Sequence, residues 1–181
     1  IDRDGAGFGS IELESGIYPG DPSLHDFDQD GDLEIAFPTS NGDIHLVHHD
    51  GATVSAAWPY DTLTFTLPSQ VALANMDATG YHDLVFATRD GRLHQMRATG
   101  EAFAGWPRPA DVPYPAVPPI VAQLGTGGPT AALGGEDGLL QLLDVTGDQE
   151  GWPRDQAAPI LAPISAADID ADGVIELMVP T

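Results

Sequence analysis

Apolar and polar residues alternate in short blocks along the chain, and glycine-containing turns separate the blocks. One kind of block is almost entirely apolar, as expected of inner strands that are buried on both faces. Its members are LEIAF (33–37), DLVFA (83–87) and IELMV (175–179). A second kind mixes apolar and polar residues and follows a turn. Its members are DIHLVHH (43–49), RLHQMRA (92–98) and LLQLLDV (139–145).

Two sets of turns bound these blocks. Asn-Gly and Asp-Gly pairs tolerate the positive φ angles of tight hairpins, so each set predicts a hairpin connection. The first set is Asp4-Gly5, Asn41-Gly42, Asp90-Gly91 and Asp137-Gly138. The second set is Ser15-Gly16, Asp50-Gly51, Thr99-Gly100 and Thr146-Gly147.

The blocks repeat with a nearly constant period. Trp58, Trp106 and Trp152, each followed by proline, recur at nearly equal spacings (106−58 and 152−106). One more strand-like run precedes each apolar block, so every repeat holds four strands. Helical periodicity is not found, and 16 prolines oppose long helices. Four short strands at this period are typical of a β-propeller blade.

The sequence therefore predicts an all-β fold, a β-propeller of four-stranded blades that forms one domain over residues 1–181. The end of the chain joined to its beginning resembles EIAFPTSNGD (34–43), so about four blades are expected, with one blade split between the N- and C-termini. The expected blades are 1–19 plus 160–181, 20–59, 68–107 and 116–153. Such closure removes exposed sheet edges. A two-chain ring of eight blades and a slice of a longer propeller are the alternatives.

Charge narrows the class of partner. The chain has 6 basic and 28 acidic residues, a formal net charge of −22. This balance argues against nucleic acid and anionic membranes, whose binding needs Lys and Arg, and it favours cations. Cysteine is absent, which excludes disulfides and thiolate metal sites. No apolar run approaches the length that a membrane-spanning helix needs, so no membrane insertion is expected.

The turn between the first two strands of one repeat concentrates acidic residues. In HDFDQDGDLEIAF (25–37), carboxylates stand at positions 1, 3, 5 and 9 of a loop, with a glycine at position 6 that permits a sharp bend. Alternate side chains of a tight loop converge, and a carbonyl at position 7 can add an oxygen. The expected metal ligands are Asp26, Asp28, Asp30, Asp32 and Glu34. Hard oxygen ligands in this number suit Ca²⁺ better than Mg²⁺.

The same spacing recurs three repeats later in DIDADGVIE, which begins at Asp168. Its expected ligands are Asp168, Asp170, Asp172, Val174 and Glu176. A weaker copy, NMDATGYHD, offers Asn75, Asp77, Thr79 and Asp83. The third repeat has glycines, Gly125 and Gly127, where carboxylates are expected. The alternative is an Asx-rich turn without a metal, which is favoured for the weaker copy.

DFDQDGDLEI and DIDADGVIEL, together with the recurring GWP (105–107 and 151–153), resemble the FG-GAP repeat family, which includes integrin α-type and VCBS-like propellers. The resemblance covers essentially the whole chain. It implies calcium binding in both full loops, with Asp32 and Val174 contributing their carbonyl oxygens. The glycine-rich third loop and the low blade number depart from the family's pattern.

Other residues offer weaker chemistry. His48 and His49 are adjacent on a strand, face opposite sides, and are not expected to share a metal. His45 and His94 occupy matching strand positions and are expected to mark a repeated exposed face. Serine-elbow, HExxH and phosphate-loop motifs are absent. The repeated tryptophans are expected to pack between blades.

The favoured function is a non-catalytic, calcium-binding propeller, extracellular or periplasmic, that serves in adhesion, assembly or the binding of a protein or carbohydrate. Calcium loops of this open kind suit an extracellular calcium supply. One alternative is an enzyme domain, a lyase or hydrolase acting on polysaccharide. Another is a structural subunit that self-associates through blade completion between chains.

Overall fold

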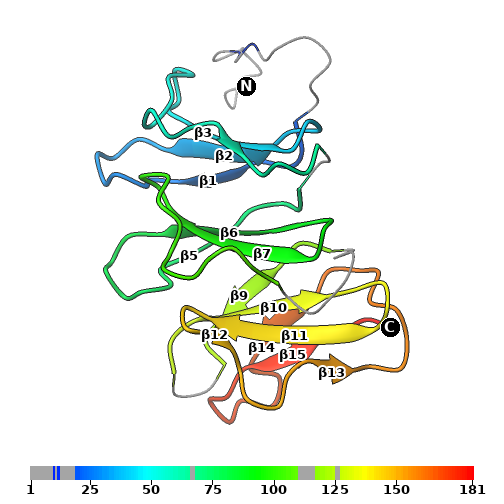
Figure 1. Ribbon diagram of the computed structural model, residues 1–181. Helices are drawn as coiled ribbons and strands as arrows, with labels where there is room; N and C mark the ends of the chain where they lie inside the picture. The colour runs from blue at the N-terminus through cyan, green and yellow to red at the C-terminus, as the bar shows by residue number, and fades with distance from the viewer. Residues whose placement is uncertain (1–9, 11, 13–18, 66–67, 110–116, 125–126) are drawn as a thin grey trace, which may run out of the picture.

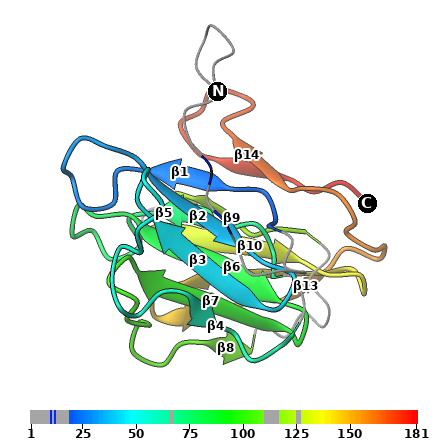
Figure 2. The ribbon, with the colours of Figure 1, turned by 90° about the horizontal axis from the view of Figure 1, so that it is seen from above.

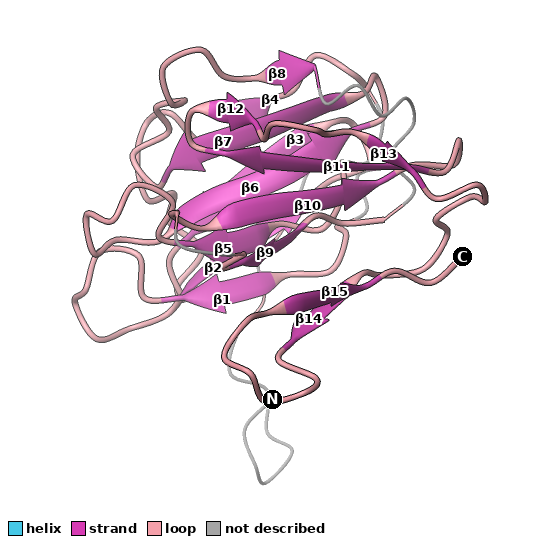
Figure 3. Cartoon of the chain, turned by 90° about the horizontal axis from the view of Figure 1, so that it is seen from below, coloured by secondary structure: helices cyan, strands magenta, loops and turns pink. Residues whose placement is uncertain are grey.

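The computed structural model describes residues 10, 12, 19–65, 68–109, 117–124 and 127–181. All regular elements in this part of the chain are β-strands, which Figure 3 shows in magenta. The strands pair antiparallel in four sheets. None of the described residues forms a helix long and apolar enough to cross a membrane.

The first two sheets each hold four strands in chain order. The first contains β1 (Ser23–His25), β2 (Glu34–Pro38), β3 (Asp43–Val47) and β4 (Tyr60–Asp61). The second contains β5 (Ala72–Ala74), β6 (Asp83–Thr88), β7 (Arg92–Arg97) and β8 (Arg108–Pro109). Each sheet is therefore a simple up-and-down meander, as expected of a propeller blade.

The third and fourth sheets continue this order. The third contains β9 (Ile120–Ala122), β10 (Thr130–Gly134), β11 (Leu139–Asp144) and β12 (Gly147–Asp148), and β13 (Arg154–Asp155) also pairs with β11. The fourth contains β14 (Ser165–Ala167) and β15 (Glu176–Met178). The fourth sheet thus has two strands among the described residues.

The sheets follow one another in space as they do in sequence (Figure 1). The first strands of neighbouring sheets lie close together: β1 lies beside β5, β5 beside β9, and β9 beside β14. Figures 2 and 3, which look along the stack, show the first three sheets one over another and the β14–β15 sheet set to one side. In the first two sheets, the loop between the first and second strands points to the same side of the molecule, on the left in Figure 1.

The core lies between neighbouring sheets. Every residue of β6 is buried, and its side chains alternate between two clusters. Leu84 and Phe86 pack in the cluster shared with the first sheet, whereas Val85 and Ala87 pack in the cluster shared with the third. This alternation is the two-residue period of a strand, and burial on both faces explains why the residues from Leu84 to Ala87 are all apolar.

Trp58 and Trp106 link neighbouring sheets through hydrogen bonds of their indole N–H groups. Trp58 is 4% exposed, and its indole N–H donates to the carbonyl oxygen of Ala98 in the next repeat at 2.8 Å. Trp106 repeats the arrangement, with an N–H donated to Val145 O at 3.2 Å. The three Trp-Pro peptide bonds are cis. A buried indole with its N–H satisfied stabilises the packing between sheets.

The predicted all-β, propeller-like fold is confirmed. The half-blade predicted for residues 1–19 falls almost wholly outside the described residues, so its pairing with 160–181 stays a prediction. The exposed face predicted for His45 and His94 is wrong. His94 is 3% exposed and stacks on Phe86, with ring centroids 4.7 Å apart, and His45 stacks on Phe37 in the same way at 5.1 Å. The reason is that clusters shared with both neighbouring sheets cover the two faces of β7, whereas the Phe37 ring covers the half-buried His45.

Candidate metal centre

The first acidic loop connects β1 and β2, and the pairing of His25 with Glu34 closes it. Its backbone turns through positive φ at two positions, Gln29 (63°) and Gly31 (98°). A non-glycine residue in the left-handed region is disfavoured by roughly 1 kcal/mol. The loop therefore holds a specific conformation that its interactions must stabilise.

The aspartates of this loop are held by backbone N–H groups. Asp26 accepts from the amides of Asp30 and Gly31, both at 3.1 Å, and Asp30 accepts from the amide of Asp32 at 2.9 Å. Carboxylate oxygens of Asp26, Asp28 and Asp30 lie within 4.8 Å of one another. Two oxygens bound to one Ca²⁺ at 2.3–2.6 Å can be at most about 5 Å apart, so the spacing fits this ion.

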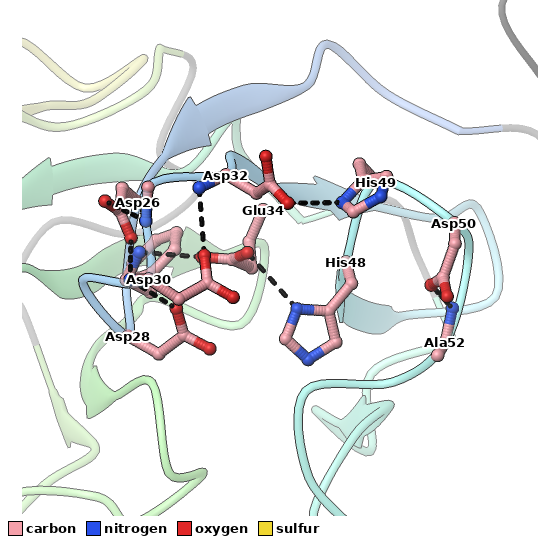
Figure 4. A network of polar contacts seen from close by, with 11 residues as sticks. Asp26, Asp28, Asp30, Asp32, Glu34, His48, His49, Asp50 and Ala52 are labelled. Carbon is pink, nitrogen blue, oxygen red and sulfur yellow. Dashed lines mark hydrogen bonds and ion pairs between the residues drawn. The ribbon is translucent and has the colours of Figure 1, made fainter.

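Glu34 closes the loop from below. Its side chain is fully buried, and Oε2 accepts the amide of Phe27 at 2.8 Å. Its other oxygen, Oε1, lies 3.2 Å from Nδ1 of His48 (Figure 4). A buried carboxylate without such partners would be strongly destabilising. The Asp32 side chain points elsewhere, 3.6 Å from His49 Nδ1.

The fourth loop, between β14 and β15, repeats this hydrogen-bonding pattern residue for residue. Asp168 accepts from the amides of Asp172 at 3.1 Å and Gly173 at 2.9 Å. Glu176 accepts from the amide of Ile169 at 2.8 Å. Oxygens of Asp168, Asp170 and Glu176 lie within 4.8 Å of one another. Positive φ recurs at the equivalent positions, 62° at Ala171 and 89° at Gly173, and the Val174 amide donates to Asp172 at 2.8 Å.

The second loop, between β5 and β6, has positive φ angles at the same positions as the first loop but different side chains at the expected ligand positions. Ala78 (φ 60°) and Gly80 (φ 94°) match the positive-φ residues of the first loop. Asp77 accepts from the Thr79 hydroxyl at 2.7 Å and from Arg97 Nη2 at 3.1 Å. The pKa of Asp77 is lowered, mainly by the Thr79 hydrogen bond and further by Arg97.

Two more residues of the second loop complete its geometry. Asp83, 2% exposed, accepts the amide of Met76 at 2.9 Å, as Glu34 accepts Phe27. Burial raises the pKa of Asp83 to about 6. The Asn75 carboxamide oxygen is buried without a hydrogen-bond partner in the described part of the chain. The second loop thus holds fewer carboxylates than the first, and one of them, Asp77, already contacts a cation, the Arg97 guanidinium of β7.

The third loop differs in length as well as composition. β9 and β10 pair Ala122 with Thr130, eight positions on (130−122), whereas His25 and Glu34 are nine apart (34−25). Thr130 thus replaces the closing carboxylate. Gly125 lies outside the described residues.

A groove runs between the first and second loops. Its volume is about 530 Å³, and its lining is mostly apolar. Phe27 and Asp28 line it from the first loop, Tyr81 and Asp83 from the second, and Arg97 from β7. The groove therefore has aromatic, acidic and basic side chains in its lining, next to the carboxylate cluster of the first loop.

The structure brings Asp26, Asp28 and Asp30 together in the first loop, and Asp168, Asp170 and Glu176 in the fourth. That these residues bind a metal ion stays a prediction. The spacing within the loops did not indicate His48, which directly follows β3, or Arg97, which ends β7, although both side chains contact loop carboxylates. The signal was present, because each follows the closing carboxylate of its loop at the same offset (48−34 and 97−83). The register of β6 and β7 pairs Asp83 directly with Arg97.

Comparison with known proteins identifies the architecture. No family model matches the chain, and no curated protein matches it. One solved structure that resembles this chain is that of BBS1N in complex with ARL6DN, soaked with lead. The match covers 92% of this chain, with 18% sequence identity and a TM-score of 0.60. The V. cholerae biofilm matrix protein Bap1 is similar at 14% identity and a TM-score of 0.55 over 90% of this chain. The shared fold is propeller-like.

The present chain matches only part of each of these structures. It spans 50% of the BBS1N chain and 27% of the Bap1 chain. At these identities the likeness concerns the fold alone.

Proposed function

We propose that this chain is a non-catalytic, calcium-binding β-propeller of the FG-GAP or VCBS-like type, working outside the cytoplasm in adhesion, assembly or ligand binding. The observation that supports calcium is the carboxylate cluster of the first loop and its copy in the fourth loop, with the same amide hydrogen bonds. The propeller-like structural neighbours support the type of module.

The ligand set fits calcium chemically. Both clusters consist of carboxylate oxygens, and the donor set contains no sulfur because the chain has no cysteine. Like charges this close repel one another, so a divalent cation relieves the repulsion within the loop. Asp26, Asp28, Asp30 and Glu34 would hold the ion in the first loop, with the carbonyl of Asp32. Asp168, Asp170, Asp172 and Glu176 would hold it in the fourth, with the carbonyl of Val174.

The role of calcium in this proposal is structural. Each loop joins the first two strands of a sheet, and the first strands of neighbouring sheets lie beside one another. An ion that fixes the loop therefore also fixes the strand on which neighbouring sheets dock. Because only the folded loop gathers the ligands, binding stabilises the folded state.

The structural neighbours favour a binding or matrix role. Bap1 is a biofilm matrix protein, and BBS1N was crystallised with a protein partner. A protein or carbohydrate ligand is proposed for the present chain, and the groove beside Asp28 and Arg97 offers it apolar surface with a few polar groups, as ligand sites do.

Thermal unfolding with and without calcium tests the proposal. With about 1 mM Ca²⁺ and a Kd near about 0.1 mM, each site should add about 1.4 kcal/mol to the free energy of unfolding. In a chain of this length that raises Tm by roughly 3–6 °C per site. Chelator should reverse the shift.

Variants assign the effect to the loops. Asp26→Asn and Asp168→Asn should each remove about half of the calcium-dependent shift. Asp137→Asn, which removes the same charge from a hairpin turn where Asp137 accepts the Leu139 amide, should leave the shift intact. A wild-type Tm that is insensitive to millimolar calcium would contradict the proposed function.

The β14–β15 sheet favours a second candidate, self-association through blade completion. Within the described residues β15 pairs only with β14, and Val174 and Met178 are exposed beside it. Unpaired apolar edges recruit further strands. If residues 1–19 complete this sheet in the same chain, light scattering should give a monomer. If another copy completes it, the mass should rise with concentration, and Met178→Lys should reduce it.

A further inference from the structure

We propose that the first loop also forms a mixed oxygen–nitrogen cation site from Asp28, Glu34 and His48, suited to a borderline divalent transition metal such as Zn²⁺. The inference concerns the same loop as the proposed calcium function and extends it to a second kind of cation. It does not require calcium to bind, so the two ideas can fail separately.

The spacing of the three ligand atoms fits such an ion. One oxygen each of Asp28 and Glu34 and one ring nitrogen of His48 lie within 4.8 Å of one another. His48 Nδ1 is 3.2 Å from Glu34 Oε1. Two ligands at 2.0–2.1 Å from a tetrahedral zinc are about 3.3 Å apart, so this pair needs little movement to share an ion. Figure 4 shows the His48 ring directed at Glu34 and the His49 ring directed away, at Asp32.

Two of the three ligands are held by the strands that flank the loop, whereas Asp28 lies in the exposed loop itself. Glu34 begins β2, is fully buried, and is fixed by the Phe27 amide. His48 directly follows β3 and opens a tight turn, where its amide donates to Ala52 O at 2.8 Å and its carbonyl accepts from Gly51 N at 2.9 Å. Supporting hydrogen bonds of this kind orient metal ligands and raise affinity.

The second repeat provides an independent indication that a cation belongs here. Its residue at the position of His48 is Arg97, and its residue at the position of Asp28 is Asp77, at the same offset (97−48 and 77−28). Arg97 Nη2 lies 3.1 Å from Asp77 Oδ2. The second repeat therefore places its own permanent cation on this carboxylate. The imidazole of the first repeat is shorter than a guanidinium side chain, and in its neutral form a ring nitrogen is free to ligate a metal ion.

The negative charge of the loop favours a divalent cation at this position. Asp26, Asp30 and Asp32 stand in the same loop as Asp28. In the described part of the chain, His48 and His49 are the only basic side chains with a nitrogen within 4.0 Å of the carboxylate oxygens of residues 26–34. Imidazole nitrogen with carboxylate oxygen is a donor set that zinc accepts readily, whereas calcium prefers oxygen alone.

Titration of the folded protein with Zn²⁺, followed by calorimetry, tests the inference, and Co²⁺ absorption reports nitrogen ligation directly. Wild type should bind one ion in the first loop. His48→Gln should weaken Zn²⁺ binding by at least about tenfold. His49→Gln, which alters the neighbouring exposed histidine, should leave it within about twofold. His48→Arg copies the second repeat, and it should abolish binding in a folded protein even if His48→Gln lowers stability.

Calcium is titrated in parallel on the same variants. Zinc affinity unchanged in His48→Gln, or lowered equally by His49→Gln, would overturn the inference and indicate adventitious binding. If zinc depends on His48 while calcium does not bind, the proposed calcium function fails and this inference stands. If calcium binds and zinc affinity does not depend on His48, the proposed calcium function stands and this inference fails.

Discussion

The imidazole of His94 is buried within the second sheet, where it stacks on Phe86 at an interplanar angle of 11°. Burial lowers the pKa of His94 to about 4, from 6.5 in the unfolded chain. The Thr88 hydroxyl lies 3.3 Å from its Nε2. Because the charged form is disfavoured inside the protein, this side chain is neutral in the fold and protonates more readily on unfolding.

The pKa shift predicts a pH dependence. Between pH 6.5 and 4 the unfolded chain binds a proton that the folded chain does not, so stability is complete above pH 6.5 and falls as the pH drops through this window. Over this window, the shifted pKa of His94 should lower the free energy of unfolding by about 3 kcal/mol. His94→Gln should remove that part of the slope in denaturant unfolding measured at several pH values.

The third repeat supports the choice of variant, because Gln141 occupies the position of His94 and is fully buried. The exposed His49→Gln serves as the control and should retain the wild-type slope. Equal slopes in wild type and His94→Gln would contradict the assigned pKa.

At the scale of elements, the end of β10 packs closely against a later segment of the chain at Gly134. A Cβ built on Gly134 would lie 2.6 Å from Ile160 Cγ2 and 2.9 Å from Ile160 Cβ. Ile160 is fully buried, and its amide donates to Gly135 O at 3.0 Å. The end of β10 is thus held against the chain that leads to β14.

Gly134→Ala should therefore destabilise the protein by about 1–3 kcal/mol through overpacking. Gly128→Ala, where a Cβ would meet no atom within 4 Å, should change stability little. Denaturant midpoints at constant m-value measure both. A neutral Gly134→Ala would show that Ile160 can move aside.

Elements were predictable where the signal is local. Apolar blocks bounded by Asn-Gly and Asp-Gly turns identified β2, β3, β6, β7, β11 and β15, since a strand and its turn are encoded in one short stretch of sequence. Whether each face of a strand is buried or exposed was not predictable, because alternation of apolar and polar residues shows only that the two faces differ. Neighbouring sheets cover both faces of β7, so Leu93, His94, Gln95 and Met96 are all buried.

The candidate site divides in the same way. The spacing from Asp26 to Glu34 indicated a carboxylate cluster because the whole loop is one short turn. His48 and Arg97 reach the loops only through the register between the second and third strands, which spacing within the loop does not encode. The missing residue of the third loop became visible only when the pairing of Ala122 with Thr130 was known.

At the scale of the molecule, the two full loops belong to the first and last sheets, and the second and third sheets separate them along the chain. They share no ligand and no hydrogen bond among those of the described residues. Distant sites contribute additively to stability, usually within about 0.5 kcal/mol.

Loss of calcium stabilisation should accordingly be additive. The double variant Asp26→Asn with Asp168→Asn should lose the sum of the two single losses in calcium-dependent unfolding free energy. Thermal melts of the four proteins at one calcium concentration measure this. A double variant no worse than either single variant would mean that one ion serves both loops or that the sheets unfold separately.

The backbone of the second loop carries a consequence for how such a protein can evolve. Ala78 and Gly80 retain the positive φ angles of the acidic loops, although the ligands have diverged. Ion binding at this blade could therefore be gained or lost by point substitutions at Asn75, Thr79 and Arg97, whereas the third loop would also need an insertion. Natural relatives can then differ in metal content blade by blade while their architecture stays the same.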